Sequence, residues 1–316
     1  MTRDTVVTVG TFDGVHRGHL DVLTRLAARG RETGLASLLL TFDPHPLELL
    51  NPAKAPLLLT TRGEKLAAIA STGIDYVVVL PFTRALADHS ARQFVDLLLR
   101  ERFRMAELLI GHDHGFGRGR AGDVETLRTL GAERGFAVDV VAPVETDDGM
   151  AVSSTRIRQA LASGDLAAAE AGLGRRYAVQ GRVVEGDARG RVLGFPTLNV
   201  LPESPRKLLP PDGVYAVLVE TPRGGFGGMM NLGGRPTFRD DRRTIEAHLF
   251  DVAGDFYDAA VQVIFVQRLR DTMRFDGPAS LMAQLAKDET AARIALTHVA
   301  ESGNLKGSMH FPPSTP

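Results

Sequence analysis

The sequence predicts two domains of different class: a parallel α/β domain, then a small antiparallel β-barrel that ends in a helix. In the first half, short apolar runs alternate with longer amphipathic segments, which is the pattern of a parallel sheet covered by helices. In the second half, short alternating segments are separated by glycine and proline, which is typical of small barrels. The length of 316 residues also favours two cores over one.

The first half is expected to begin with a βαβ unit. Apolar residues from Leu20 to Ala27 recur at helical spacing between the first two expected strands, and Gly30 is expected to end that helix. The expected strands are 6–9, 36–41, 76–80, 108–110 and 137–141.

The second half is expected to form the barrel. An alanine- and leucine-rich helix over 156–173 should join it to the first half, and a helix over 280–300 should follow it. The expected barrel strands are 177–184, 214–219, 229–232, 244–250 and 261–266.

Composition excludes several classes of function. A formal net charge of -1 and the absence of tryptophan argue against a nucleic-acid surface. The absence of cysteine excludes disulfides, thiolate metal sites and cysteine nucleophiles. No apolar run is long enough to span a membrane, and the first residues lack a secretory signal. We therefore expect a cytoplasmic protein that acts on small molecules, with its oligomeric state left open.

A glycine- and histidine-containing segment follows the first expected strand. It reads Gly10-Thr11-Phe12-Asp13-Gly14-Val15-His16-Arg17-Gly18-His19 and leads into a helix. Glycines allow backbone to approach phosphate, and a helix N-terminus offers unpaired N–H groups to an anion. His16 and His19 are three residues apart, so on one helical turn they share a face and can stabilise phosphate charge together. Taken alone, the segment is better explained as a tight turn with two partly buried, satisfied histidines.

Three further clusters shift the balance toward a nucleotide site. The sequence Thr-Phe-Asp-Pro-His-Pro at 41–46 follows the second strand, and Gly-His-Asp-His-Gly-Phe-Gly at 111–117 follows the fourth. Open parallel sheets bind ligands at these carboxyl ends. The sequence Ser-Ser-Thr-Arg-Ile-Arg at 153–158 combines hydroxyls with arginine, which is either a plain helix cap or a phosphate contact.

These motifs resemble the adenylyltransferase half of prokaryotic bifunctional riboflavin kinase/FAD synthetases, which has a Rossmann-like nucleotidyltransferase sheet. Positions 113 and 114 depart from the family, which more often has an aromatic residue in place of His114 and can have asparagine in place of Asp113. The resemblance implies ATP contacts at Gly10, Phe12, Asp13, His16, His19, Ser154, Thr155 and Arg158. It implies flavin contacts at Asp43, Pro46, Asp113 and Phe116.

The second half carries its own phosphate-binding candidates. A glycine-rich segment over 181–191 can wrap phosphates or simply form a hairpin. Thr197 and Asn199 share a face of an extended segment and offer the oxygen ligands that Mg²⁺ prefers, unless they only begin a strand. Glu246 lies within an apolar strand, where it either faces solvent or takes a proton from an acceptor hydroxyl.

These elements resemble the riboflavin kinase barrel in type and order. The segments are Gly194-Phe195-Pro196-Thr197-Leu198-Asn199, then Gly213-Val214-Tyr215, residues 231–238, and Glu246-Ala247-His248. Leu198 replaces the family's usual alanine and is expected to point away from Thr197 and Asn199. The resemblance implies ATP contacts at Gly186, Arg189, Gly190, Gly194, Thr197 and Asn199, with Thr197 and Asn199 also binding the metal. It implies flavin contacts at Glu246, Arg274 and Phe275. From the residues alone, Arg268, Arg270, Arg274 and Phe275 either cover the nucleotide or flavin or form a solvated face.

The two resemblances together imply a bifunctional enzyme of FAD synthesis. The expected domains are an FMN adenylyltransferase over 1–174, a riboflavin kinase over 175–303 and a flexible tail over 304–316. The kinase would convert riboflavin and ATP to FMN, and the adenylyltransferase would convert FMN and ATP to FAD and pyrophosphate. Both steps should need Mg²⁺, with His16, His19, Arg158 and Glu246 as the catalytic residues.

Two other hypotheses stay open at this point. The first half alone would also suit an adenylyltransferase for another phosphorylated metabolite, such as a pantetheine phosphate or nicotinamide mononucleotide, but this leaves the second-half motifs unexplained. A non-catalytic flavin or nucleotide sensor is the other hypothesis. Tight FMN binding without ATP turnover would favour it.

Overall fold

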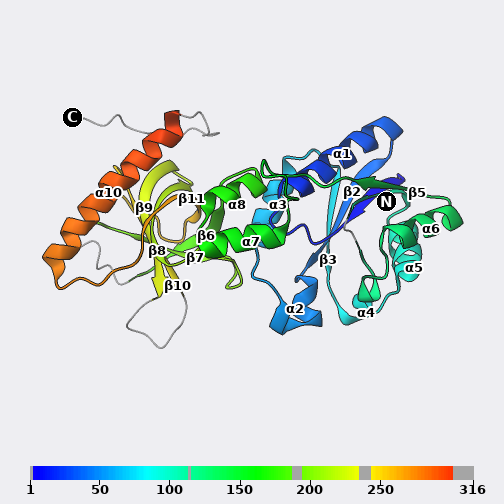
Figure 1. Ribbon diagram of the computed structural model, residues 1–316, viewed down its shortest axis with the longest axis horizontal. Helices are drawn as coiled ribbons and strands as arrows, with labels where there is room; N and C mark the ends of the chain where they lie inside the picture. The colour runs from blue at the N-terminus through cyan, green and yellow to red at the C-terminus, as the bar shows by residue number, and fades with distance from the viewer. Residues whose placement is uncertain (1–2, 113–114, 187–193, 235–242, 302–316) are drawn as a thin grey trace. The chain divides into compact units, whose positions relative to one another are not determined.

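The computed structural model describes residues 3–112, 115–186, 194–234 and 243–301 (Figure 1). The chain divides into two compact units: the first unit is Met1–Ser154 and the second unit is Thr155–Pro316. The predicted boundary at residue 174 lies after this division.

The first unit contains a parallel sheet of five strands in the order β3-β2-β1-β4-β5. Alternate residues of a strand point to opposite faces, so Val6 packs with Leu23 of helix α1 on one side. Val7 packs with Phe94 and Leu99 on the other. The sheet is therefore covered on both faces, as its apolar strands predicted. Its strands are β1 (Thr5–Val9), β2 (Ala36–Asp43), β3 (Tyr76–Pro81), β4 (Met105–Gly111) and β5 (Ala137–Val141).

Helices of very different lengths connect these strands, and most of them were not predicted from the sequence pattern. They are α1 (Arg17–Thr33), α2 (Pro46–Leu50), η1 (Pro52–Lys54), α3 (Arg62–Ala70), α4 (Arg84–Ala87), α5 (Ala91–Gln93), the π-helix η2 (Phe94–Arg102), η3 (Arg118–Arg120) and α6 (Val124–Arg134). Several are only one turn long, so hydrophobic periodicity has too few residues to reveal them.

The expected end of helix α1 at Gly30 is wrong. The helix continues to Thr33 and ends at Gly34, which has the left-handed φ of 72° that favours glycine at a helix end. Gly30 is instead buried inside the helix, where an added Cβ would lie 3.1 Å from the Leu35 carbonyl oxygen. Glycine at position 30 therefore lets the helix approach the chain that follows it.

The second unit is built around a closed antiparallel barrel with the strand order β10-β7-β6-β11-β8-β9. Ile245 and Ala247 of β10 are buried, whereas Glu246 between them lies on the outer face. Helix α10 (Pro278–Glu301) packs on the barrel through Ala292 and Leu296 (Figure 1). The strands are β6 (Ala178–Val184), β7 (Leu198–Pro202), β8 (Gly213–Thr221), β9 (Gly224–Gly234), β10 (Arg243–Leu249) and β11 (Ala260–Arg270).

The expected single helix over 156–173 is also wrong. The structure has helix α7 (Ser154–Ser163) and helix α8 (Leu166–Leu173), separated at Gly164, whose φ is 81°. The side chain of Asp165 caps α8 by accepting from the Ala168 N–H at 2.9 Å. A glycine followed by a capping aspartate therefore ends one helix and begins the next.

Candidate active sites

Three predicted clusters stand at one edge of the parallel sheet. The histidine-containing loop follows β1. The cluster that begins at Thr41 includes the last residues of β2, and the cluster that begins at Gly111 starts at the last residue of β4. Since these strands are parallel, their carboxyl ends share that edge. Strand order also reverses between β1 and β4, the position where such sheets bind ligands.

His16 and His19 are brought together at the start of helix α1. His16 is the N-cap residue, and its Nδ1 accepts the His19 backbone N–H at 3.3 Å. Their rings stack with centroids 3.6 Å apart. Because Nδ1 of His16 is an acceptor, its neutral form carries the proton on Nε2, which can donate to a phosphate. Phe12 and Val15 hold this loop in left-handed conformations with φ of 49° and 39°, as is common at functional sites.

Asp13 anchors the same loop from a buried position. Its carboxylate accepts from the Leu59 N–H at 3.0 Å, and from the Thr60 N–H at 2.9 Å and hydroxyl at 3.1 Å. The Gly14 N–H donates to the Thr60 hydroxyl at 2.9 Å, and the Ser154 hydroxyl donates to the Asp13 carbonyl at 2.9 Å. The structure thus gives the Asp13 carboxylate a positioning role, and its contact with ATP stays a prediction.

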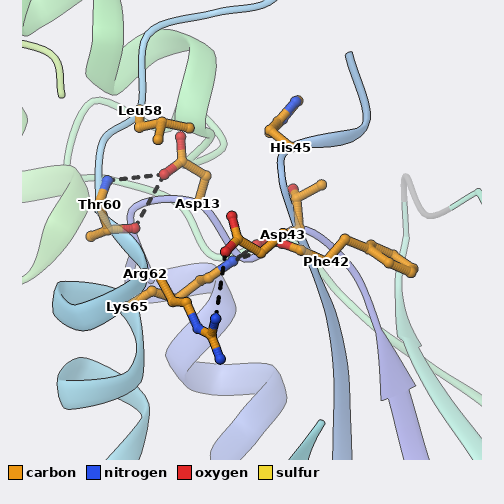
Figure 2. A pocket seen from close by; sticks show the side chains of 9 residues that line it. Asp13, Phe42, Asp43, His45, Leu58, Thr60, Arg62 and Lys65 are labelled. Atoms are coloured by element: carbon orange, nitrogen blue, oxygen red, sulfur yellow. Dashed lines mark hydrogen bonds and ion pairs between the residues drawn. The ribbon is translucent and has the colours of Figure 1, made fainter. Parts of the chain in front are cut away.

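A pocket opens beside this anchor at the end of β2 (Figure 2). Arg62 lies 3.9 Å from the Asp43 carboxylate. Burial lowers the pKa of the Lys65 ammonium, and the carboxylates of Asp13 and Asp43 oppose that shift. Residues that line the pocket include Thr11, Asp13, Asp43, Thr60, Arg62 and Lys65.

Sequence reasoning missed Thr60, Arg62 and Lys65. A signal was present, because Thr61 and Glu64 form a capping box that marks the start of helix α3. A helix start next to the nucleotide motif would have pointed to this segment, but the motif and the segment are far apart in sequence. Only the fold shows that they meet.

The predicted flavin contacts of the first unit are distributed unevenly. Asp43 is exposed near the pocket, and Pro46 begins helix α2. Phe116 is 7% exposed and packs on Phe94 with ring centroids 4.7 Å apart, so most of its ring belongs to the hydrophobic core. Asp113 lies outside the described residues, as does His114. The flavin contacts at these positions stay predictions.

The fourth sequence cluster begins helix α7. Ser154 is tied to the first unit by its hydrogen bond to Asp13. Thr155 and Arg158 belong to the second unit, so their predicted contacts with ATP stay predictions.

The barrel brings Asn199 and Glu246 directly opposite each other. Strands β7 and β10 are antiparallel neighbours, and these two residues are partners in their register. A Cβ added to Gly186 would lie 2.0 Å from Nδ2 of Asn199, so the amide occupies the space that a side chain at position 186 would need. Leu198 pairs instead with Ala247, a fully buried residue on the other face. Three predicted kinase residues, Gly186, Asn199 and Glu246, are therefore neighbours.

His248 supports the turn that carries Thr197. Its Nδ1 lies 2.8 Å from the Pro196 carbonyl oxygen, and since a carbonyl only accepts, Nδ1 carries the proton. The His248 ring also meets Phe195 edge to face at 5.3 Å. Gly194 begins the turn with a φ of 83°, which favours glycine. Arg189 and Gly190 lie outside the described residues.

The arginines after β11 have separate surroundings. Arg270 forms a double hydrogen bond with Asp288 of helix α10, at 2.9 Å and 2.6 Å, and lies 5.9 Å from the Phe275 ring. Arg268 donates to the Asp212 carbonyl at 2.7 Å. Arg274 is exposed. Arg268 and Arg270 therefore hold the barrel end together, while flavin contacts at Arg274 and Phe275 stay predictions.

Two features are absent from the described part of the chain. Within 3–112, 115–186, 194–234 and 243–301, no helix has the length and apolar character needed to cross a membrane. The same residues contain no group of three or more histidine, aspartate or glutamate side chains placed to hold a metal ion.

Comparison with known proteins agrees with both resemblances. The FAD synthetase model matches residues 1–156, and the riboflavin kinase model matches residues 173–296. The bifunctional riboflavin kinase/FMN adenylyltransferase of Escherichia coli K12 is 43% identical over 292 residues, 91% of each chain. Its counterpart in Pseudomonas fluorescens is 40% identical over 92% of this chain and 93% of the relative.

A solved structure also resembles the chain over most of its length. It is described as a macrolide-efflux protein from Streptococcus pneumoniae and matches with a TM-score of 0.82 at 31% identity, over 93% of this chain and 95% of that one. Family models that cover both halves, and relatives that match almost end to end, identify the family. This chain belongs to the bifunctional riboflavin kinase/FMN adenylyltransferases, with the FAD synthetase part first and the riboflavin kinase part second.

Proposed function

We propose that the chain makes FAD in two reactions at separate sites. Riboflavin and ATP give FMN and ADP in the barrel, and FMN and ATP give FAD and pyrophosphate in the α/β unit. One observation carries this proposal. Each family-matched segment contains its own paired reactive side chains, with His16 and His19 stacked in one and Asn199 opposite Glu246 in the other.

Adenylyl transfer requires the charge on the ATP phosphates to be stabilised. An oxygen of the FMN phosphate attacks the α-phosphorus, and the bond from that phosphorus to the bridging oxygen breaks to release pyrophosphate. His16 and His19 donate N–H groups at the start of α1, where the helix dipole also favours negative charge. We assign the ATP phosphates to this end of the helix and the flavin to the side of Asp43 and Pro46. The ATP contacts predicted for Ser154, Thr155 and Arg158 are part of the same proposal.

Phosphorylation requires a riboflavin hydroxyl to lose its proton as it attacks the γ-phosphorus. Glu246 is the carboxylate suited to orient that hydroxyl and accept the proton, while ADP leaves. Its strand position is fixed between Asn199 and Asn231, its partners on the two neighbouring strands. The ATP phosphates are assigned to Gly186, Gly194, Thr197 and Asn199, and the flavin ring to the Arg274 and Phe275 side.

Mg²⁺ fits the oxygen groups near Asn199. A magnesium ion usually keeps several waters and takes only one or two protein oxygens together with the nucleotide phosphates. Bound there, it would neutralise phosphate charge during transfer. Thr197 offers a hydroxyl and Asn199 an amide oxygen, and the Asn199 amide is held against Gly186. These two residues are the proposed ligands.

The proposal extends to domain limits and partners. We assign residues 1–174 to the adenylyltransferase, 175–303 to the kinase and 304–316 to a tail. The break between family matches, from 156 to 173, supports a boundary in this region. We propose that the protein acts on small-molecule substrates in the cytoplasm and that it binds neither nucleic acid nor a membrane.

Separating the products by chromatography tests the proposal. The chain is incubated with ATP and Mg²⁺, and with either riboflavin or FMN. Riboflavin should give FMN and then FAD, with ADP and pyrophosphate as co-products, and FMN should give FAD directly. If FMN were converted to FAD but riboflavin were not converted to FMN, the kinase assignment would be wrong. Flavin binding without any turnover would instead favour the sensor hypothesis.

A further inference from the structure

Lys65 is a buried lysine that the proposed chemistry leaves unused. It lies in the first turn of helix α3, and only 8% of it is exposed. Burial disfavours the charged ammonium, and so does the positive end of the helix dipole. A lysine in such a place needs specific interactions that compensate both effects.

The Lys65 ammonium makes three hydrogen bonds to two neighbouring strand ends. Nζ donates to the Thr11 carbonyl at 3.1 Å, the Thr41 hydroxyl at 3.2 Å and the Phe42 carbonyl at 3.3 Å. An ammonium has three protons, so these contacts use each of them. The Thr41 hydroxyl in turn donates to the Thr11 carbonyl at 3.0 Å. Lys65 therefore joins the loop after β1 to the end of β2 (Figure 2).

The two joined segments carry residues assigned to the reaction. Thr11 lies in the loop that leads to His16, and Phe42 directly precedes Asp43. Their strands pair in parallel, so a shift of either segment changes the distance between the proposed ATP and flavin sites. Misplacement by about 1 Å can slow a reaction by about 10²-fold.

Lys65 also balances charge in the pocket. Asp13, Asp43, Arg62 and Lys65 line it, two carboxylates and two cations. Loss of the lysine charge would leave two carboxylates with one guanidinium beside the proposed triphosphate site. A net negative pocket would repel ATP.

We propose that Lys65 is a positioning residue for adenylyl transfer: its ammonium clamps the loop after β1 to the end of β2 and balances the carboxylates beside the nucleotide. It acts through the backbone of Thr11 and Phe42 and touches neither substrate. This inference rests on the proposed adenylylation by the first unit.

The absence of cysteine from the chain allows a direct test. The variant Lys65→Cys has one thiol, which is alkylated in denaturant with bromoethylamine before refolding. The thiolate sulfur displaces bromide, which restores an ammonium on a chain of lysine length. Iodoacetamide treatment gives a neutral side chain for comparison. Lys65→Met is the uncharged variant, and Lys54→Met removes an exposed lysine of the same unit as a matched control.

We expect Lys65→Met and Lys65→Cys to lower kcat for FAD formation from FMN by about 10²-fold. Aminoethylation should restore kcat to within about tenfold of the refolded wild type, and iodoacetamide should not. Lys54→Met should match the wild type. Calorimetry should still show the unfolding transition of the first unit in Lys65→Met.

Three results would overturn the inference. One is FAD formation by Lys65→Met within about threefold of the Lys54→Met control, a change of less than 1 kcal/mol. Another is equal recovery with both alkylating reagents, since the charge would then be irrelevant. The third is loss of the first unit's unfolding transition, which would make Lys65 a residue needed for folding. Failure of the proposed function is distinct, because wild-type protein would then make no FAD from FMN and ATP.

Discussion

The two sites are built by different means. In the first unit, loops at strand ends carry the reactive groups, and buried polar contacts hold the loops, as when Asp13 binds the backbone of Thr60. In the barrel, the pleat and register of antiparallel strands place Asn199 opposite Glu246. A loop site therefore depends on a few long-range polar side chains, whereas a strand site depends on the whole ladder.

Substitution of His19 is expected to separate the two sites most clearly. His19→Ala removes one of the stacked donors, so adenylylation of FMN should slow by about 10²–10⁴-fold. Riboflavin phosphorylation by the same variant should be unchanged. His89→Ala changes a partly exposed histidine of the same unit, which lies in helix-end contact with the Ala85 carbonyl, and serves as the control. Comparable loss of FMN formation in His19→Ala would contradict two separate sites.

Substitution of Glu246 is the reciprocal experiment. Glu246→Ala removes the proposed proton acceptor, and phosphorylation of riboflavin should fall by about 10²–10⁴-fold. FAD formation from supplied FMN should persist at the wild-type rate. Glu220→Ala changes an exposed strand glutamate of the same barrel and should leave both rates intact. Unimpaired phosphorylation by Glu246→Ala would show that another group handles the hydroxyl proton.

The ion pair between Arg270 and the buried carboxylate of Asp288 tests how much the stability of the barrel end depends on side chains. Asp288 is 3% exposed and binds the Arg270 guanidinium. Asp288→Ala leaves that arginine without its buried partner, so the free energy of unfolding of the second unit should fall by about 3–5 kcal/mol. Denaturant titration measures the loss, and Lys287→Ala on the exposed side of α10 is the control. A change below about 1 kcal/mol would mean that water replaces the carboxylate.

A smaller, pH-dependent effect is expected at the edge of the sheet. Hydrogen bonds from the Ser37 N–H and hydroxyl, at 2.8 Å and 2.7 Å, lower the pKa of Asp75 below its usual value. The ionised form is therefore favoured in the folded protein, and its stabilisation is present above the unfolded pKa of about 3.9 and lost as pH falls through the folded pKa.

Asp75→Asn should consequently lower the Tm of the first unit by a few degrees at pH 7, and the difference from wild type should shrink below about pH 4. Asp147→Asn, an exposed loop change, should have little effect at either pH. A Tm difference that stays constant from pH 7 to pH 3 would show that ionisation of Asp75 does not contribute.

Much of each site could be predicted from local sequence. The histidine motif was placed correctly at the start of α1, because a strand, a glycine-rich turn and a helix follow one another along the chain. The end of α1 was predicted wrongly because the sequence does not show which of two glycines ends the helix. Gly30 lets the helix pack closely against the following chain, whereas Gly34 has the left-handed conformation that ends the helix. Phe116 was expected beside flavin, yet most of its ring lies in the core against Phe94. Sequence alone does not show how much of an aromatic ring is buried.

The sequence by itself determined the class of each unit, the strand-end position of the nucleotide motif and the alternation that separates Leu198 from Asn199. These are local properties, since periods of two and 3.6 residues are set by backbone geometry. Tertiary structure alone decided that Lys65 meets Thr11 and Phe42, and that Glu246 faces Asn199. Those contacts join residues far apart in sequence, and their partners are chosen by strand order and register, which local pattern does not specify.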